Sequence, residues 1–199
     1  MVSRLWLVLA LFTAVLLGGC GYNDIQRQDQ AVKAAWAEVL NQYQRRADLI
    51  PNIVATVKGE ANFEQETLTQ IADARASVGR MNVSPETLND PAAFDRFQKA
   101  QGQLGGALSR LLAVSENYPN LKANAAFQDL RAQLEGAENR IAIARKRYID
   151  TVAQYNTTLA LLQNKLGAML AGAKEKPQFT VADEAAVSKP PTVDFGGRK

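Results

Sequence analysis

The side chains of this chain that could do chemistry are of few kinds. The sequence has 199 residues, a single cysteine and no histidine. Histidine is the commonest general base and the commonest metal ligand in proteins. The sequence therefore excludes Ser-His-Asp and Cys-His catalysis, and zinc sites built from histidine and cysteine, within the chain. The chemistry that remains belongs to one thiol, Cys20, and to carboxylates, amides, arginines and lysines.

Cys20 follows an apolar leader and is the residue that we expect to be modified. Arg4 precedes an almost unbroken apolar run over residues 5–17. This is typical of a secretory signal, and the run is shorter than the about 20 residues that a transmembrane helix needs. Leu17-Gly18-Gly19-Cys20 resembles the bacterial lipoprotein box, in which small residues admit the peptidase and the thiol takes a diacylglyceryl group as a thioether. An uncleaved signal anchor with an incidental cysteine is the alternative.

The lipoprotein resemblance predicts how the protein is held in the cell. We expect residues 1–19 to be a lipoprotein signal peptide, and no cofactor other than the covalent diacylglycerol and N-acyl chain on Cys20. Each buried methylene contributes about 0.8 kcal/mol, so two or more acyl chains attach a protein stably to a bilayer. Gly21, and not aspartate, follows the cysteine. In a Gram-negative bacterium this implies the outer membrane, facing the periplasm; in a Gram-positive cell it implies the outer face of the plasma membrane.

The overall charge gives no sign of a nucleic-acid partner. The formal net charge is +3, and positive and negative residues are mixed along the chain. A nucleic-acid surface needs clustered positive charge. Residues 20–199 are enough for one domain with a sizeable core, and one cysteine allows no disulfide within the chain.

A second group of candidate residues is polar and lies near predicted helix ends. Its members are Arg45, Arg46, Asp48, Asn52, Lys58, Glu116, Lys122, Asn124, Glu138 and Arg140. In the structural interpretation, Asp48 caps a helix and Arg46 pairs with a carboxylate. Lys122 and Asn124 then satisfy groups at helix ends. In the functional interpretation, the group forms a partner-binding end of a helical bundle. Catalysis by carboxylates alone is the third interpretation, but it needs two carboxylates lining a cleft.

Four amphipathic helices are predicted to position these residues. Apolar residues recur at steps of three and four over residues 25–47, 49–78, 91–117 and 123–171. We therefore expect an all-α fold, an antiparallel up-and-down bundle of four helices, over residues 20–173. The last helix has heptad-like spacing, as in a coiled coil, and would span about 74 Å at 1.5 Å per residue. We expect it to break near Asn164 or to project beyond the others.

Pro51 leaves the first helix boundary open. Asp48 can cap a helix that has Pro51 in its first turn. The apolar steps nevertheless continue through the proline, which also fits a single kinked helix. We favour the turn, because the other prolines between the leader and residue 173 also fall at proposed joints. Trp36 and Tyr43 lie on the apolar stripe and are expected in the core.

Residues 174–199 are predicted to form an extended, disordered tail. Prolines, terminal glycines and scattered charges are typical of such a segment. Phe179 and Phe195 are its only large apolar residues. Each could be a docking point, but we favour a mobile tail.

Two further patterns have a structural and a functional interpretation. Gly102, Gly105 and Gly106 favour close approach of another helix, with a local binding notch as the alternative. The basic run Arg145-Lys146-Arg147 is expected to be a solvated face. Attraction to anionic lipid head groups is its alternative.

Several blocks of the chain together resemble the LemA family of bacterial envelope proteins. They are Tyr22-Asn23, Ala34-Ala35-Trp36, Arg45-Arg46-Ala47-Asp48-Leu49-Ile50-Pro51-Asn52, Val57-Lys58-Gly59, Glu116-Asn117-Tyr118-Pro119-Asn120-Leu121-Lys122-Ala123-Asn124, Phe127, Glu138-Asn139-Arg140-Ile141-Ala142, Ala144-Arg145, Tyr148, Tyr155-Asn156 and Pro191-Thr192-Val193-Asp194-Phe195. Two positions depart from the family pattern. Glu60 replaces an aromatic residue, and Leu162-Gln163 replaces a Phe-Pro pair that would break the last helix.

The resemblance implies a membrane-anchored helical bundle, and it implies no enzymatic activity. We therefore expect a scaffold or adaptor of the bacterial cell envelope, with the lipid bilayer and an envelope protein as partners. Self-association is also possible. The first alternative is a membrane-surface module that binds or shapes lipid, and the second is an unrecognised carboxylate-dependent hydrolase.

Overall fold

The structure is a computed structural model that describes residues 2–60 and 63–180, with side chains from residue 21 onward except that of Gln163. The described part contains six α-helices, two short 3-10 helices and no strand. The prediction of an all-α protein is therefore confirmed. The elements in order are α1 (Val2–Lys58), α2 (Gln65–Gly79), η1 (Pro85–Asn89), α3 (Pro91–Ser115), α4 (Pro119–Ala123), α5 (Ala125–Ala160), η2 (Leu162–Asn164) and α6 (Lys165–Ala171).

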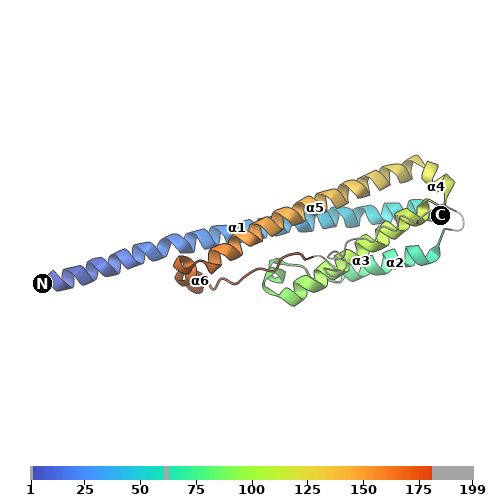
Figure 1. The fold of residues 1–199 in the computed structure, drawn as a ribbon. Coiled ribbons are helices and arrows are strands. Elements are labelled where there is room, and N and C mark those ends of the chain that lie inside the picture. Colours follow the sequence, from blue (N-terminus) through green and yellow to red (C-terminus); the bar gives the residue numbers. More distant parts are fainter. Residues whose placement is uncertain (1, 61–62, 181–199) are drawn as a thin grey trace, which may run out of the picture.

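Two pairs of antiparallel helices make the body of the protein (Figure 1). In the first pair, α1 packs along α5, with Arg46 opposite Glu138 and Trp36 opposite Tyr148. In the second pair, α2 packs against α3 as a hairpin that lies along the first pair. The first part of α1 extends beyond the other helices, and α4 lies at the opposite end of the body.

α1 continues through Pro51, so the turn that we favoured at this position is wrong. Proline in a helix interior costs about 3 kcal/mol. On either side of the proline, however, Ile50, Ile53 and Val57 are each no more than 2% exposed. Burying each such side chain contributes about 1.5–3 kcal/mol, which outweighs the proline. The first joint lies instead between the end of α1 at Lys58 and the start of α2 at Gln65.

The core consists of two clusters that follow each other along the helices. The first surrounds Trp36, which is 1% exposed and contacts the rings of Phe94, Phe97 and Tyr148. The second joins the end of α1 to α2, α3 and the start of α5 through aliphatic side chains. The predicted core positions of Trp36 and Tyr43 are confirmed.

The long last helix breaks, which was one of its two predicted alternatives. α5 ends at Ala160, and Leu161 has extended backbone with φ −64° and ψ 130°. Asn164 then donates its Nδ2 to the carbonyl of Thr158 at 3.0 Å, which satisfies a helix-end group. α6 turns back against α1, where a Cβ added to Gly167 would lie 3.1 Å from the backbone nitrogen of Tyr22.

Residues 174–180, which we call the strap, are extended, as predicted, and pack against the helical body, so Phe179 is a docking point, the alternative to the mobile tail that we favoured. Phe179 is 6% exposed and packs against Trp36, Phe94 and Tyr148. Phe179 is the only large apolar residue of the strap, so its ring provides the main apolar contact between the strap and the helices. Phe195 and the rest of the tail lie outside the described residues.

Candidate functional site

Arg46 is the buried polar centre of the helical body. The residue is 2% exposed, and its side chain extends from α1 to residues of α3 and α5. Its Nη1 donates to Glu138 Oε1 at 2.8 Å, and its Nη2 donates to Gln101 Oε1 at 2.6 Å and to the Gln101 carbonyl at 3.2 Å. The guanidinium also lies 5.1 Å from the ring centre of Tyr43. The prediction that Arg46 pairs with a carboxylate is confirmed.

A small notch opens beside this network, between α3 and α5. It has a volume of about 260 Å³ and is lined in part by Gly102, Gly105 and Gly106. A Cβ on Gly105 would lie 3.3 Å from Arg46 Nη1, whereas a Cβ on Gly102 or Gly106 would meet nothing within 4 Å. The close approach of the Arg46 side chain therefore explains a glycine at position 105 alone. Gly102 and Gly106 face open space in the notch.

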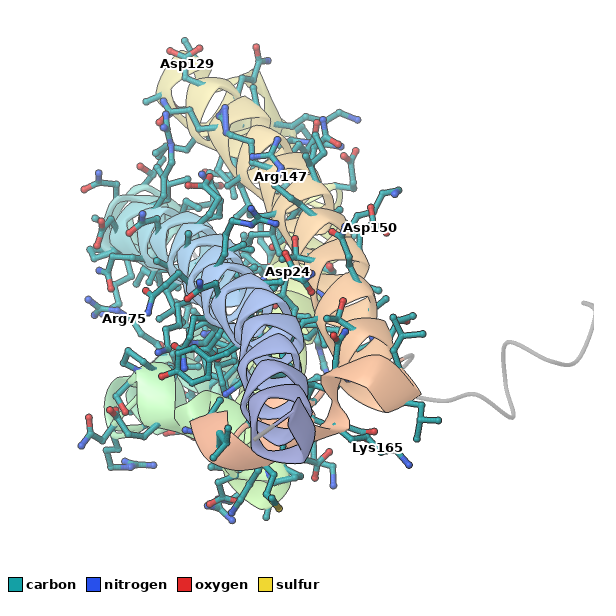
Figure 2. All side chains as sticks on the ribbon, turned by 90° about the vertical axis from the view of Figure 1, so that its left-hand side faces the viewer. Asp24, Arg75, Asp129, Arg147, Asp150 and Lys165 are labelled. Atoms are coloured by element: carbon teal, nitrogen blue, oxygen red, sulfur yellow. The ribbon has the colours of Figure 1, made fainter. Side chains whose placement is uncertain are left out.

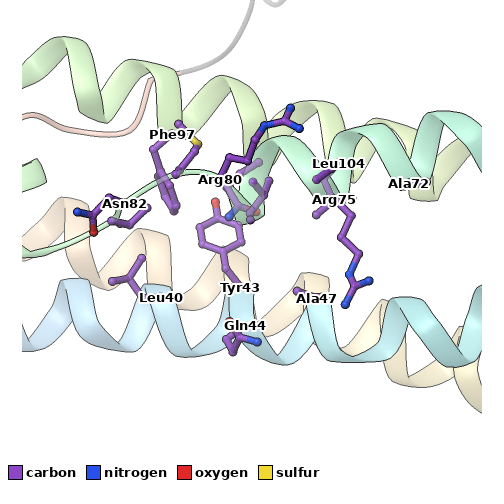
Figure 3. A pocket seen from close by; sticks show the side chains of 16 residues that line it. Leu40, Tyr43, Gln44, Ala47, Ala72, Arg75, Arg80, Asn82, Phe97 and Leu104 are labelled. Carbon is purple, nitrogen blue, oxygen red and sulfur yellow. The ribbon is translucent and has the colours of Figure 1, made fainter.

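A groove lies between α1 and the α2–α3 hairpin (Figure 3). Its volume is about 860 Å³. The lining residues are mostly apolar or uncharged and include no carboxylate: Leu40, Tyr43, Gln44, Ala47, Ala72, Arg75, Ala76, Val78, Gly79, Arg80, Met81, Asn82, Val83, Phe97, Gln101 and Leu104. This apolar hollow with two cationic side chains is suited to binding, and it lacks the groups that acid–base chemistry needs.

The two arginines of the groove are its only charged lining residues. Figure 3 shows the Arg75 side chain reaching from α2 toward α1, while Arg80 points outward. Both are exposed, and neither pairs with a carboxylate within the described residues. Tyr43 stands between the helices, and its burial raises the pKa of the phenol. An acidic ligand in the groove can therefore pair with Arg75, and one that extends past the end of α2 can also reach Arg80.

A second charged cluster lies at the α3–α4–α5 turn. Glu116 pairs with Lys122 at 2.6 Å and with Arg131 at 2.7 Å. The hydrogen bond from Lys122, followed by that from Arg131, lowers the pKa of Glu116. Asn124 accepts a hydrogen bond from the Phe127 amide at 3.2 Å and caps α5. Its predicted capping role is confirmed, whereas Lys122 pairs with Glu116 and not with a helix-end group.

The remaining polar candidates do not join these two clusters. Asp48 is exposed in the middle of α1, where it accepts a hydrogen bond from Gln44 Nε2 at 2.7 Å, so its predicted capping role is wrong. The exposed residues without a place in either cluster are Arg45, Asn52, Lys58 and Arg140. Because α1 continues through Asp48 to Lys58, the end of the helix lies about 15 Å beyond Asp48 at 1.5 Å per residue. A single polar cap at one bundle end does not form.

The anchoring of the strap was missed from the sequence. Lys176 is 8% exposed; its Nζ donates to Asn89 Oδ1 at 2.6 Å and pairs with Asp29 at 3.3 Å. The Asn156 amide brackets the Lys176 backbone, accepting from its N–H at 2.9 Å and donating to its carbonyl at 3.0 Å. Tyr148 Oη donates to the Pro177 carbonyl at 2.8 Å. The apolar Phe179 was the only sequence signal for this segment.

Asp29 is held as a carboxylate by the two lysines around it. Burial acts to raise its pKa, but the hydrogen bonds and charges of Lys33 and Lys176 outweigh burial and lower the pKa below its ordinary value. The strap is thus tied to α1 by a partly buried charge pair, with the Lys33 Nζ 2.7 Å from the same carboxylate.

Two further observations limit the chemistry of the described part. No group of three or more His, Cys, Asp or Glu side chains there is arranged to hold a metal ion. Among the residues whose side chains are described, no helix has the length and apolarity to cross a membrane. Cys20 lies in α1 but outside those residues, so its lipidation stays a prediction.

Comparison with known proteins gives one family and a set of relatives. The model of the LemA family matches residues 35–195. The magnetosome protein MamQ of Magnetospirillum gryphiswaldense is 24% identical over 188 residues, which cover 86% of this chain and 68% of that protein. The magnetosome proteins MamQ 1 and MamQ 2 of Paramagnetospirillum magneticum are 24% identical over 189 residues, covering 87% of this chain and 69% of each relative.

Proposed function

The chain belongs to the LemA family, and from this premise we propose that it is a membrane-anchored, non-catalytic scaffold or adaptor of the bacterial cell envelope. Acyl chains on Cys20 attach it to the bilayer after residues 1–19 are removed. In a Gram-negative bacterium it lies on the outer membrane and faces the periplasm. The long helices then hold a binding surface away from the lipid.

The groove between α1 and the α2–α3 hairpin is the observation that carries this proposal. Its volume of about 860 Å³ falls within the range of ligand-binding clefts. Its apolar wall suits the apolar face of a helical segment. Arg75 and Arg80 have no carboxylate partner in the described part of the chain, so they can pair with acidic residues of that segment. The proposed partner is therefore an envelope protein that presents an acidic, amphipathic segment.

The composition of the groove also favours an adaptor over a carboxylate-dependent hydrolase. Such a hydrolase needs two carboxylates that flank the scissile bond. None of the residues that line the groove is acidic. The notch beside Arg46 has one carboxylate, Glu138, and this is already paired with the arginine. Neither hollow supplies the pair.

The exposed polar residues of α1 remain proposed partner contacts. Arg45, Asp48, Asn52 and Lys58 are all accessible, and Ala47 on the same helix lines the groove. None of these four residues lines the groove itself, so they would contact parts of the partner outside it. Asp48 is the acidic residue of the four, and its side chain accepts a hydrogen bond from Gln44 of the same helix.

Site-specific photo-cross-linking in living cells tests the proposal. A photoreactive residue replaces Ala76 in the groove, and a second strain carries it at Asp129 on α5. We expect Ala76 to capture a defined protein and Asp129 not to capture it. The capture should be lost when Arg75→Glu and Arg80→Glu are combined; each single reversal should weaken it, and Arg147→Glu, a single reversal at an exposed arginine of α5, should keep it.

The same experiment has outcomes that contradict the proposal. Capture that is equal at both positions, or that survives the reversal of both groove arginines, would show that the groove does not select the partner. Recovery of lipid alone would favour the membrane-surface alternative. Asp48→Ala in parallel shows whether the exposed face of α1 contributes: a weaker capture assigns it a contact, and an unchanged one does not.

A further inference from the structure

Most of the exposed large apolar side chains of the described residues come from one short stretch of the chain. One lies in the break after α5, and the others lie on η2 and α6. We call them the apolar patch, and their exposed fractions are Leu161 46%, Leu162 81%, Leu166 55%, Met169 72% and Leu170 69%. The other exposed large apolar residues of the described part, Tyr22 and Ile143, lie on α1 and α5.

The orientation of α6 is the reverse of what packing in water would favour. Its buried side is made of small residues: Gly167 is buried, and Ala168 and Ala171 pack against the core around Trp36. Its outer side carries Leu166, Met169 and Leu170. Each exposed Å² of apolar surface forgoes about 25 cal/mol that burial would provide. A contiguous exposed patch of this kind marks a surface that another phase or molecule covers.

The place of α6 in the fold indicates what covers it. α6 packs directly on the backbone of α1 at Gly21 and Tyr22, so close that a Cβ on Gly167 would lie 3.1 Å from the Tyr22 nitrogen and 3.3 Å from the Gly21 carbonyl carbon. Gly21 is the residue next to Cys20. The patch therefore lies at the end of the body where α1 leads to the proposed lipid anchor (Figure 1).

The charges around the patch match an anionic surface. Residues 157–174 contain two lysines, Lys165 and Lys174, and no Asp or Glu; Glu175 follows directly, and Asp24 of α1, near Leu161, is paired with Arg27. Figure 2, seen from the side where α1 begins, shows Lys165 where η2 passes into α6. Lysine keeps its stem along apolar surface while its ammonium group reaches phosphate. An apolar helix face flanked by lysines is typical of helices that lie in the membrane interface.

We propose that η2 and α6 form a second membrane contact, in which the apolar patch inserts into the interface of an anionic lipid bilayer. This inference rests on the proposed attachment at Cys20, because the anchor is what holds α6 at the lipid. Two contacts fix the orientation of the body, whereas acyl chains alone would leave it free to rotate. The turn at α4 then lies at the end of the body far from the membrane.

The test uses the full-length, acylated protein in vesicles of phosphatidylethanolamine and phosphatidylglycerol. Met169→Cys is labelled with an environment-sensitive fluorophore, and Asp129→Cys on α5 is labelled as the remote control. Acylated Cys20 has no free thiol, and the parent protein measures any background labelling. We expect blue-shifted emission at residue 169 that brominated lipids quench at least twofold more than at residue 129. Leu166→Glu with Leu170→Glu should abolish this difference, and Ile143→Glu, an exposed apolar control on α5, should leave it.

Each other outcome overturns the inference in a distinguishable way. If the protein floats with the vesicles but both labels behave alike, the anchor holds and α6 does not touch lipid. If the protein does not float, the proposed anchoring fails as well. If the label at residue 169 is blue-shifted without quenching by bromine, and labelled copies transfer energy to one another, a second copy covers the patch.

Discussion

Replacing Phe179 with alanine is expected to release the strap from the helical body. The ring is 6% exposed and lies 4.9 Å from Phe94 and 5.5 Å from Tyr148 between ring centres. The guanidinium of Arg145 lies 4.5 Å above it. The other buried side chain of the strap, Lys176, is held by polar and charged groups.

The size of the effect follows from these contacts. Burying a phenylalanine contributes about 1.5–3 kcal/mol. Favourable ring pairs add about 0.5–1.5 kcal/mol, and the cation–π contact adds about 0.5–1 kcal/mol. The strap lies at the periphery, so it can detach while the rest of the core stays packed. We therefore expect a value in the lower part of this range: the free energy of unfolding should fall by about 3 kcal/mol. That corresponds to a change on the order of 10² in the strap's opening equilibrium.

Hydrogen exchange and urea unfolding measure this prediction together. The amides of Lys176 and Thr180 donate to Asn156 Oδ1 and Gln98 Oε1. Their exchange should become faster by roughly the same 10² factor, since local opening governs their protection. Phe179→Leu, which keeps apolar bulk, should have a smaller effect. Glu175→Ala, an exposed control in the strap, should have almost none.

One result would refute the reasoning. If Phe179→Ala leaves the exchange of both amides unchanged, and its urea midpoint moves no more than that of Glu175→Ala, the strap is not held by the ring. Circular dichroism should show unchanged helix content in all three variants, because the strap contains no helix.

The remaining predictions concern the buried charge, the glycines and pH. Arg46→Ala leaves the buried Gln101 side-chain oxygen unpaired, whereas the Glu138 carboxylate is 45% exposed and can be hydrated, so the free energy of unfolding should fall by about 1–3 kcal/mol; an unchanged urea midpoint would contradict this. Gly102→Ala adds a Cβ in open space inside a helix and should raise stability by up to about 1 kcal/mol, whereas Gly167→Ala meets the α1 backbone and should lower the thermal midpoint. The pKa of Asp29 in the folded protein lies below its ordinary value, so the stability that this carboxylate contributes is present above the ordinary pKa and is lost as pH falls through the lower folded one. Asp29→Asn should therefore weaken the acid dependence of strap amide exchange, and an unchanged pH profile would show that its pair with Lys176 does not hold the strap.

The features that the sequence predicted well are local ones. Steps of three and four residues identified the buried faces, including Trp36 and Tyr43, because a helix repeats every 3.6 residues whatever it packs against. Asn124 was recognised as a cap because capping joins residues two or three apart. The same locality led to an error at Asp48 and Pro51, where the residues for a helix start are present but α1 continues.

Only the tertiary structure decided which segments, far apart in the sequence, pack against one another. Burial of Ile50, Ile53 and Val57 with residues of α2 and α3 offsets the cost of Pro51, and no local pattern contains that balance. Phe179 becomes part of the core because α1, α3 and α5 leave a site for its ring. The sequence shows that α6 contains both small residues and leucines, but not which of them face the body. Because α6 packs on the backbone of Gly21 and Tyr22, its small residues face inward and its leucines face outward. The free energy of such contacts depends on surfaces brought together across the chain, and the order of residues does not state which surfaces meet.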